Sequence, residues 1–504
     1  MATFTVTNTN NSGAGSLRQE ILDANALKGK DIINFGGLFN DGLAHTISLT
    51  GSGLIITDDT IIQGRNPNLL TISDNSATRV FDITTAVTAV INGLTVTNTY
   101  NGYNNGTAGG GGISNEGTLT LNNSIITGNT VYHNALDTQE NTISAGGGIY
   151  NTGSLTVNYS TISNNSAGDS YSYYSDGGGI YNTGSLTVKG SNITGNIIGD
   201  EIDSFGGGIY SVQPLNNGIN SNSVLVINST ITNNSGEFGG GIYLENGIVS
   251  HSTISGNSAD FGGGLYLINV TLSYSTITNN SVPANGGGIF SSGGTISYST
   301  ISGNSAGENG GGITSSRSTV SYSTISGNSA GENGGGIYTE VNDIISHSII
   351  SGNSAQDGGG IYASYSDGTV SHSIISDNTA KEQGGGIYLY LAGVDSQIFL
   401  NVSDSTLSNN QAHFGAGIYN EGALIVSKSI IKHNRAFGIE LSSGKKESGK
   451  GGGIYNNFTY SGTSTLDYST IACNFDTPEE DSTKFIKVDN LVGKFIKKGS
   501  SVKG

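Results

Sequence analysis

A seventeen-residue segment that occurs twice constrains the fold of this chain more than any other feature. Residues 297–313 and 321–337 both have the sequence SYSTISGNSAGENGGGI, and the two copies are 24 positions apart. Two shorter motifs, Gly-Gly-Gly-Ile and Ile-x-x-Asn, each occur thirteen times between residues 110 and 474, with single changes such as Ala416 for a glycine. Self-similarity with a period of about 20 to 50 residues is typical of a solenoid, in which each repeat stacks on its neighbours.

The residue pattern within each repeat predicts strands and turns. Short apolar and polar runs alternate and are interrupted by Gly or Asn, whereas an amphipathic helix needs apolar residues three and four positions apart. Leu155, Val157 and Ile162, for example, would lie on the inner face of two short strands, and a third strand would begin at Ile180. Three strands in about 24 residues fit one turn of a parallel β-helix, whose turns are about 4.8 Å apart. We therefore predict an all-β fold, a single-stranded right-handed parallel β-helix.

The two motifs have separate physical roles. Glycine allows a positive φ at a corner and lets neighbouring turns approach where a Cβ atom would obstruct them. Asparagine tolerates the left-handed region, and its amide can hydrogen-bond to the asparagine of the next turn. We expect a glycine corner and an asparagine corner in every turn.

The first 98 residues contain strand-like runs without the Gly-Gly-Gly-Ile motif. Residues 16–26 predict a short N-terminal helix, with Ser16 as N-cap and Gln19 at the capping-box position. Three apolar residues would share its buried face: Leu17, Ile21 and Leu22. Such a helix can cap the open end of the stack, where uncovered strand edges would promote aggregation.

We expect three segments, which can form one domain because a solenoid grows without enlarging its cross-section. They are an N-terminal cap with irregular first turns (1–98), regular turns (99–475) and a C-terminal tail or cap (476–504). Insertions would leave the regular turns at residues 132–144, 169–176, 212–223, 389–399 and 436–450. The apolar residues of the tail lie near one helical face, which indicates a helix that covers the last turn or lies on a membrane surface: Phe485, Val488, Val492, Phe495 and Ile496.

Several segments resemble bacterial surface proteins. Residues 4–8 (FTVTN), 12–19 (SGAGSLRQ) and 31–35 (DIINF) look like the N-terminal segment of large surface proteins with right-handed β-helices. The two repeated motifs resemble the Gly-Gly-Ala-Ile and Phe-x-x-Asn repeats of the chlamydial polymorphic membrane proteins, with Ile in place of Phe. The resemblance extends to about residue 475 and implies a pectin-lyase-like fold. It also implies an extracellular or cell-surface location, although no signal peptide is visible and the export route is open.

Composition excludes some partners. The net charge is −18, and the only basic residues between positions 80 and 427 are Lys189, Arg317 and Lys381. We expect no nucleic-acid partner, because phosphate binding needs a basic track. No run approaches 18 apolar residues, so we expect no transmembrane segment. Cys473 is the single cysteine, which rules out an intramolecular disulfide.

Our first hypothesis is a non-catalytic surface or secreted protein, structural or adhesin-like, with cell-surface glycans or other surface proteins as partners. A tyrosine follows most Gly-Gly-Gly-Ile motifs and should point outward if the isoleucine points inward. The candidates for carbohydrate binding are Tyr338, Tyr362 and Tyr388. Simple aromatic stacking along the sheet explains the same column.

The alternative is a polysaccharide-active enzyme, a lyase or hydrolase of the pectin-lyase-like fold. Such enzymes need a basic proton acceptor or paired carboxylates in a groove. The repeats contain few basic residues, and an acidic surface repels uronate polymers. One repeat position holds either histidine or tyrosine, which indicates a structural ladder, and we name no catalytic residue: His251, Tyr274, Tyr298, Tyr322, His347 and His372.

A second alternative is an ice- or mineral-binding face. Thr-Ile-Thr and Thr-Ile-Ser triplets such as residues 276–278, 300–302 and 324–326 would project two ranks of hydroxyl groups. Ordinary β-propensity explains these residues equally well. Ile349, Ile374 and Ile430 interrupt one rank.

We expect no required cofactor, but calcium is one ion that the pattern suggests. Acidic residues recur just before the glycine motif, and stacked carboxylates about 5 Å apart repel unless a cation such as Ca²⁺ bridges them. The candidate ligands are Asp260, Glu308, Glu332 and Asp357. A solvated acidic edge that keeps molecules apart is the simpler explanation.

Overall fold

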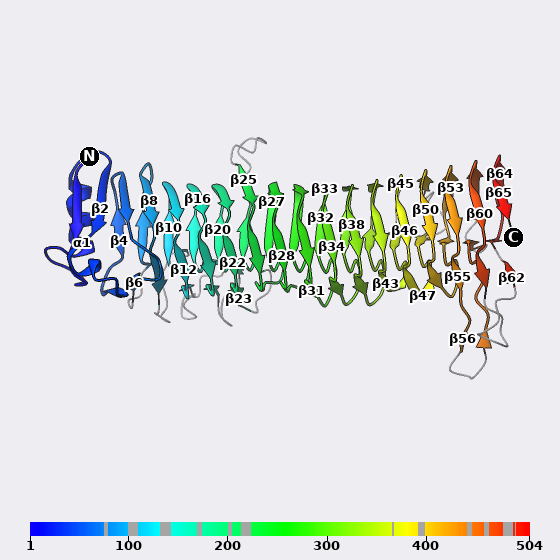
Figure 1. Ribbon diagram of the computed structural model, residues 1–504, viewed down its shortest axis with the longest axis horizontal. Helices are drawn as coiled ribbons and strands as arrows, with labels where there is room; N and C mark the ends of the chain where they lie inside the picture. Colours follow the sequence, from blue (N-terminus) through cyan, green and yellow to red (C-terminus); the bar gives the residue numbers. More distant parts are fainter. Residues whose placement is uncertain are drawn as a thin grey trace. The chain divides into compact units, whose positions relative to one another are not determined.

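The computed structural model describes most of the chain as parallel β-helix. The described residues are 1–74, 79–98, 109–131, 143–168, 174–199, 204–212, 223–364, 367–391, 399–440, 446–457, 463–476, 487–488 and 490–503. They form two compact units, Met1–Ala259 (unit 1) and Asp260–Gly504 (unit 2). Within each unit, successive strands stack in parallel, turn upon turn (Figure 1). The predicted right-handed parallel β-helix with one short helix is confirmed.

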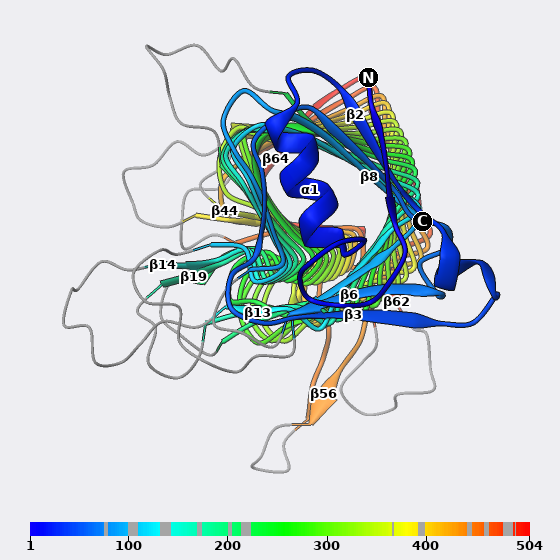
Figure 2. The same cartoon turned by 90° about the vertical axis from the view of Figure 1, so that its left-hand side faces the viewer.

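Unit 1 begins with the predicted cap. Helix α1 (Leu17–Ala26) starts after Ser16, whose Oγ accepts a hydrogen bond from the Gln19 N–H at 3.2 Å. It packs on three strands and lies across the end of the first turns (Figure 2): β1 (Thr3–Val6), β2 (Asp31–Phe35) and β4 (Leu54–Ile56). The buried face consists of Leu17, Ile21 and Ala24, whereas Leu22 is 54% exposed, contrary to the prediction. Leu22 is turned by about 100° from Ile21 and therefore points to solvent.

The strands of unit 1 lie on the faces of the coil. The first face continues with β5 (Thr60–Gln63), β7 (Phe81–Ile83), β8 (Thr88–Asn92), β10 (Ile113–Asn115), β11 (Thr118–Asn122), β15 (Ile149–Asn151), β16 (Ser154–Asn158), β20 (Ile180–Asn182), β21 (Ser185–Lys189), β24 (Ile209–Ser211), β25 (Val224–Ile227) and β27 (Ile242–Ser250). The second contains β3 (His45–Leu49), β6 (Leu70–Asp74), β9 (Thr95–Asn98), β12 (Ile125–Thr127), β17 (Thr161–Ser163), β22 (Asn192–Thr194), β26 (Thr230–Thr232) and β28 (Thr253–Ser255). The third contains β13 (Thr130–Val131), β18 (Ser166–Ala167) and β23 (Ile197–Ile198). A short pair, β14 (Ile143–Ala145) and β19 (Tyr174–Asp176), and the 3-10 helix η1 (Gly37–Asn40) complete the unit.

Unit 2 repeats this plan with more regular turns. Its first face contains β29 (Leu265–Ser273), β32 (Ile289–Ser292), β33 (Thr295–Ser297), β36 (Ile313–Ser316), β37 (Thr319–Ser321), β40 (Ile337–Thr339), β41 (Ile344–Ser346), β44 (Ile361–Ser364), β45 (Asp367–Ser371), β48 (Ile387–Tyr390), β49 (Phe399–Ser403), β52 (Ile418–Asn420), β53 (Ala423–Ser427), β58 (Ile454–Asn456), β59 (Thr463–Asp467), β63 (Leu491–Val492) and β64 (Phe495–Lys498). The second contains β30 (Thr276–Thr278), β34 (Thr300–Ser302), β38 (Thr324–Ser326), β42 (Ile349–Ser351), β46 (Ile374–Ser376), β50 (Thr406–Ser408), β54 (Ile430–Lys432), β60 (Thr470–Ala472) and β65 (Ser501–Lys503). The third contains β31 (Ser281–Val282), β35 (Ser305–Ala306), β39 (Ser329–Ala330), β43 (Ser354–Asp357), β47 (Thr379–Gln383), β51 (Gln411–Ala412), β55 (Arg435–Ala436), β61 (Phe475–Asp476) and the antiparallel β62 (Lys487–Val488).

The core of each unit is made of apolar columns that run from turn to turn. In unit 1, Ile149 pairs with Ile180 and Ile180 with Ile209, and all three are fully buried. In unit 2, Ile313, Ile337 and Ile361 form the equivalent column. The isoleucine of the glycine motif therefore faces inward in both units, as predicted.

The asparagine of the Ile-x-x-Asn motif forms a buried hydrogen-bonded ladder. In unit 1 the ladder runs through Asn129, Asn165, Asn196, Asn234 and Asn257, with amide-to-amide distances of 2.8–3.0 Å. Unit 2 has the same ladder from Asn280 to Asn490. The left-handed residue is the one before the ladder asparagine, for example Asn164 with φ 53°, so that part of the prediction was wrong. The ladder asparagines hydrogen-bond to the next turn, and the residues that precede them form the left-handed bend.

The glycine corner allows the close approach that the sequence predicts. The first glycine of the motif has positive φ, as in Gly310 with 66°. At the second position, a Cβ atom on Gly311 would clash with the Ser329 carbonyl oxygen. Larger residues are excluded there because the obstacle is a backbone atom, which cannot move aside without disturbing the neighbouring turn.

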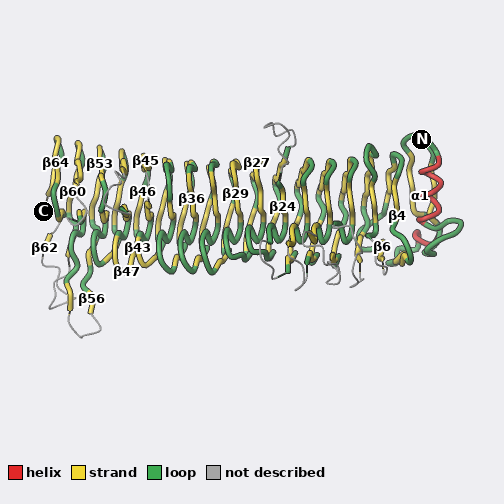
Figure 3. The backbone as a smooth tube through the Cα atoms, turned by 180° about the vertical axis from the view of Figure 1, so that it is seen from behind, coloured by secondary structure: helices red, strands yellow, loops and turns green. Residues whose placement is uncertain are grey.

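The C-terminal tail continues the coil and is not helical. Residues 491–503 form β63, β64 and β65, which pair with strands of the preceding turn. The predicted tail helix is therefore wrong: Val492, Phe495 and Ile496 lie in strands, and Phe485 lies outside the described residues. Of the predicted insertions, 436–450 contains an antiparallel hairpin of β56 (Ile439–Glu440) and β57 (Lys446–Glu447), and the others lie largely outside the described residues. Figure 3 shows that strands and loops make up nearly all of the described chain. Within the described residues, no helix has the length and hydrophobicity that a membrane span requires.

Candidate functional site

The predicted tyrosine column of unit 2 exists and is densely packed. Tyr338, Tyr362 and Tyr388 occupy equivalent positions in β40, β44 and β48. The rings of Tyr338 and Tyr362 stack with centroids 5.3 Å apart, whereas those of Tyr362 and Tyr388 meet edge to face at 4.8 Å. Tyr362 and Tyr388 are only 7% and 5% exposed, and Tyr338 is half-buried. The column therefore shows the aromatic stacking that we expected, and carbohydrate binding stays a prediction in which Tyr338 is the most accessible ring.

A carboxyl group that the sequence analysis missed lies beside this column. Glu421 follows β52 and is 5% exposed. Its carboxylate accepts hydrogen bonds from the Leu391 N–H at 3.3 Å and from the Asn457 amide at 3.2 Å, and Tyr388 lies near it. Asn457 also donates to the Tyr419 hydroxyl oxygen at 2.9 Å. We call Tyr362, Tyr388, Tyr419, Glu421 and Asn457 the tyrosine–glutamate cluster.

Burial raises the pKa values of several ionisable groups on this face. It raises the pKa of Asp357 to about 7, opposed by a hydrogen bond from the Gln383 N–H to Oδ1 at 2.9 Å. Burial likewise raises the pKa of Glu421. The pKa values of Tyr362, Tyr388 and Tyr419 are raised, first by burial and then by nearby tyrosines and carboxylates. Near neutral pH the face therefore combines neutral tyrosine hydroxyl groups, aromatic rings and the Asp357 carboxyl group, which can hold a proton, and such groups can contact sugar hydroxyl groups.

Unit 1 carries a related but simpler arrangement. Tyr150, Tyr181, Tyr210 and Tyr243 form its column, and the first two rings stack in parallel at 4.9 Å. Asp176 is 6% exposed, and burial raises its pKa to about 7. Both units thus place an acidic side chain of raised pKa beside stacked tyrosines.

The predicted calcium ligands are not all neighbours. Glu308 and Glu332 lie in adjacent turns, because the Glu332 N–H donates to the Glu308 carbonyl oxygen. Asp260 is separated from Glu308 by the turn that contains Ala284, and Asp357 aligns with Asn333, one position further along. Among the described residues, no group of three or more His, Cys, Asp or Glu side chains could hold a metal ion. Calcium binding stays a prediction that concerns Glu308 and Glu332 above all.

The histidine/tyrosine position forms a second aromatic ladder, at an exposed corner. Tyr274, Tyr298, Tyr322, His347 and His372 stack in sequence in unit 2, with centroids 4.6–4.9 Å apart. Each has φ near 50°, so these bulky residues make a left-handed bend. The stacked rings confirm the structural ladder, and their edges rather than their faces are presented to solvent.

The two hydroxyl ranks expected for an ice-binding face are both present in unit 2, and one of them is short. Thr276, Thr300 and Thr324 align in β30, β34 and β38, and Ile349 and Ile374 continue the same rank, so the predicted interruption is confirmed. The second rank is unbroken through six strands: Thr278, Ser302, Ser326, Ser351, Ser376 and Ser408.

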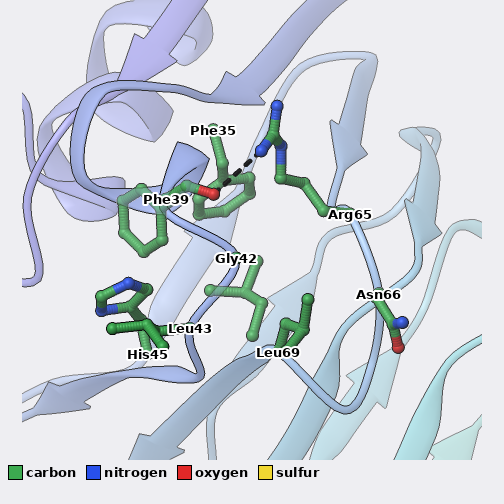
Figure 4. A pocket seen from close by; sticks show the side chains of 9 residues that line it. Phe35, Phe39, Gly42, Leu43, His45, Arg65, Asn66 and Leu69 are labelled. Atoms are coloured by element: carbon green, nitrogen blue, oxygen red, sulfur yellow. Dashed lines mark hydrogen bonds between the residues drawn. The ribbon is translucent and has the colours of Figure 1, made fainter.

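A separate pocket of about 160 Å³ lies near the start of unit 1 (Figure 4). Its walls come from the end of β2, from η1, from the start of β3 and from the turn before β6. The lining residues are Phe35, Phe39, Gly42, Leu43, His45, Arg65, Asn66, Leu69 and Leu70.

Sequence reasoning missed Glu421 and this pocket for different reasons. Glu421 had a local signal, since Asn420-Glu-Gly replaces the Asn-Thr-Gly that follows Tyr150 and Tyr181. The pocket had none, because its two segments, 35–45 and 65–70, lie outside the repeats.

Comparison with known families supports the repeat architecture. Residues 344–458 match the model of the right-handed β-helix region. Residues 159–183, 274–292 and 322–340 match the model of the Chlamydia polymorphic membrane protein repeat. The chain is therefore a β-helix repeat protein, with repeats similar to those of that membrane-protein family. None of the curated proteins matches the chain.

Two solved structures are similar at low identity. One is the catalytic domain of a GH87 alpha-1,3-glucanase variant in complex with tetrasaccharides, with 12% identity over 99% of this chain and 68% of that one, and a TM-score of 0.28. The other is the A-module of the mannuronan C-5 epimerase AlgE6 of Azotobacter vinelandii, with 11% identity over 98% of this chain and 99% of that one, and a TM-score of 0.23. TM-scores this low carry no conclusion about what this chain does.

Proposed function

We propose that this chain is a non-catalytic, extracellular or cell-surface β-helix of adhesin-like function, with cell-surface glycans or other surface proteins as partners. The observation that carries the proposal is the match of three stretches to the polymorphic membrane protein repeat. The hydrogen bonds that polar side chains make inside the coil also support the proposal. The ladder asparagines hydrogen-bond one turn to the next, which is a structural and not a catalytic role.

We assign glycan binding to the exposed edge of the tyrosine column, beside the tyrosine–glutamate cluster. An aromatic ring there matches the apolar face of a sugar, and the buried members of the cluster hold the column in place. Tyr338, half-buried beside Tyr362, is the ring at the accessible edge of the cluster. Neutral glycans fit better than uronate polymers, because the net charge of −18 repels a polyanion.

Two measurements test the proposal. Fractionation of the native cells, with protease applied to intact cells, should place the protein outside the cytoplasm. A glycan array should show saturable binding of neutral glycans that Tyr338→Ala weakens about tenfold, since one ring contact is lost. Tyr298→Ala, on the exposed ladder at another corner, is the matched control and should bind normally. A cytoplasmic location, or equal binding by both variants, would contradict the proposal.

The raised pKa values of Asp357 and Glu421 favour a second candidate, a polysaccharide-active enzyme. A carboxyl group that stays protonated near neutral pH can act as a general acid, and a second carboxyl group can act as base or nucleophile. Incubation with a panel of polysaccharides, followed by an assay for new reducing ends and unsaturated products, tests it. Activity that Asp357→Asn and Glu421→Gln abolish would support the enzyme and refute the non-catalytic proposal.

A further inference from the structure

We infer that the pocket beside η1 binds a small monocarboxylate whose apolar body is about the size of one six-membered ring. The inference is independent of the proposed function, since the pocket lies in unit 1 and shares no residue with the tyrosine–glutamate cluster. It rests on the size of the pocket, its walls and one cation at its rim.

The walls of the pocket are aromatic and aliphatic. The Phe39 ring meets the Phe35 ring edge to face at 5.2 Å and the His45 ring at 5.5 Å. Phe35 and Phe39 are each 5% exposed, so their positions are held by packing. Leu69 and Leu70 add the aliphatic wall (Figure 4). A cavity of about 150 Å³ with such walls accepts benzene in another protein, and this pocket has about 160 Å³.

Arg65 supplies a positive charge that is oriented by the fold. Its side chain lines the pocket, and its Nη1 donates to the Phe39 carbonyl oxygen at 2.9 Å, which fixes the guanidinium beside Phe35 and Phe39 (Figure 4). The two ion pairs among the described residues are His45–Asp41 and Arg79–Asp82, so neither includes Arg65. A guanidinium with further N–H donors is suited to a planar carboxylate.

Asp41, next in sequence to the lining residue Gly42, already has hydrogen-bond partners. Asp41 Oδ1 accepts hydrogen bonds from His45 Nε2 at 2.9 Å and from the Leu43 N–H at 2.8 Å. The hydrogen bond from His45 lowers the pKa of Asp41, which keeps this carboxylate ionised and paired. An incoming carboxylate can therefore meet Arg65 while its apolar body enters between Phe39 and Leu69.

A monocarboxylate fits this arrangement better than other small ligands. A phosphate or dicarboxylate brings two charges to one guanidinium and leaves the apolar walls unused. An uncharged aromatic compound fills the walls but leaves the Arg65 donors in water. Only a ligand with one carboxylate and one apolar body satisfies both parts of the pocket.

The test is ligand-observed NMR on the full chain with benzoate as the probe, and with benzyl alcohol and acetate as partial probes. We expect saturable benzoate binding in the millimolar range, and at least about tenfold weaker binding of each partial probe, because one charge-assisted hydrogen bond or the ring contact is missing. Arg65→Gln should weaken benzoate binding about tenfold and should leave benzyl alcohol binding unchanged.

Arg79→Gln, which removes an arginine of unit 1 that does not line the pocket, is the matched control and should bind benzoate normally. Leu43→Ser changes an exposed wall residue, 65% exposed, and should weaken both ring-containing probes without unfolding the unit. Thermal melting confirms that each variant is folded. Absence of benzoate binding, equal binding of benzoate and benzyl alcohol, or unchanged binding by Arg65→Gln would overturn the inference.

Discussion

The asparagine ladder and the tyrosine face of unit 2 are built from the same repeat but respond differently to change. The ladder has asparagine in every described turn, with every amide buried and bonded to the next at nearly constant distance. The tyrosine column also contains Phe290 and Thr314, and the angle between its neighbouring rings varies from 4° to 82°. The ladder holds the coil together, and the tyrosine face is where individual turns acquire their own chemistry.

The largest effect should come from breaking the ladder. Asn328→Ala removes the Oδ1 that accepts from the Asn304 backbone and amide nitrogens, each at 3.0 Å, and the Nδ2 that donates to Asn353 and to the Ile301 carbonyl oxygen. Two buried donors lose their acceptor, so we expect a loss of about 3 to 4 kcal/mol. Chemical denaturation measures it. Thr300→Ala, at an exposed position, is the control, and a loss below about 1 kcal/mol in Asn328→Ala would contradict the structural role of the ladder.

The next prediction distinguishes the tyrosine face from the asparagine ladder by the pH dependence of stability, since the ladder contains no ionisable group. The pKa of Asp357 is raised to about 7 from 3.8 by burial, so the folded state binds this proton more tightly than the unfolded chain. The resulting stabilisation is complete below about pH 4 and is lost as the pH rises through about 7. We expect about 2 kcal/mol after screening by solvent, from melting curves at pH 5 and pH 8.

Asp357→Asn tests that assignment, because asparagine cannot titrate. The variant should lose this share of the pH dependence, whereas Glu332→Gln, which changes an exposed carboxylate in the neighbouring turn, should keep it. If both variants show the same pH profile as the original chain, Asp357 is not the responsible group.

A smaller loss of stability should follow from a substitution in the tyrosine–glutamate cluster. Tyr388→Phe removes the hydroxyl that lies near the Glu421 carboxyl group but keeps the packed ring. We expect a loss of about 1 to 2 kcal/mol, because a buried carboxyl group loses a polar neighbour. Tyr362→Phe is the matched control in the adjacent turn. Equal stability of the two variants in chemical denaturation would mean that the Tyr388 hydroxyl contributes nothing specific.

The smallest expected effect concerns calcium. Among the predicted ligands, only Glu308 and Glu332 occupy equivalent positions in adjacent turns, so a bound ion would have few protein ligands. We expect millimolar calcium to stabilise unit 2 by about 1 kcal/mol relative to chelator, and Glu332→Gln to abolish the difference. An unchanged melting midpoint with and without chelator would count against calcium.

The repeat period, the strands and the inward isoleucines could be predicted because they depend on local spacing. The left-handed bends could not be assigned correctly, since Asn164 and Asn165 are equally suited by residue type and only their pairing with the next turn separates their roles. The tail was predicted wrongly for a related reason. Its apolar residues fit a helix, but the edge of the preceding turn offers backbone hydrogen bonds that favour strands.

The sequence alone determined that the chain forms a stack of turns, because the spacing of its glycine, asparagine and isoleucine residues does not fit a helix or an antiparallel sheet. Only the tertiary structure decided which residues from different turns become neighbours. The assembled coil brings Glu421 beside Tyr388, aligns Asp357 with Asn333 instead of Glu332, and forms a pocket between residues 35–45 and Arg65. Such contacts depend on register across turns, and register is a property of the assembled coil.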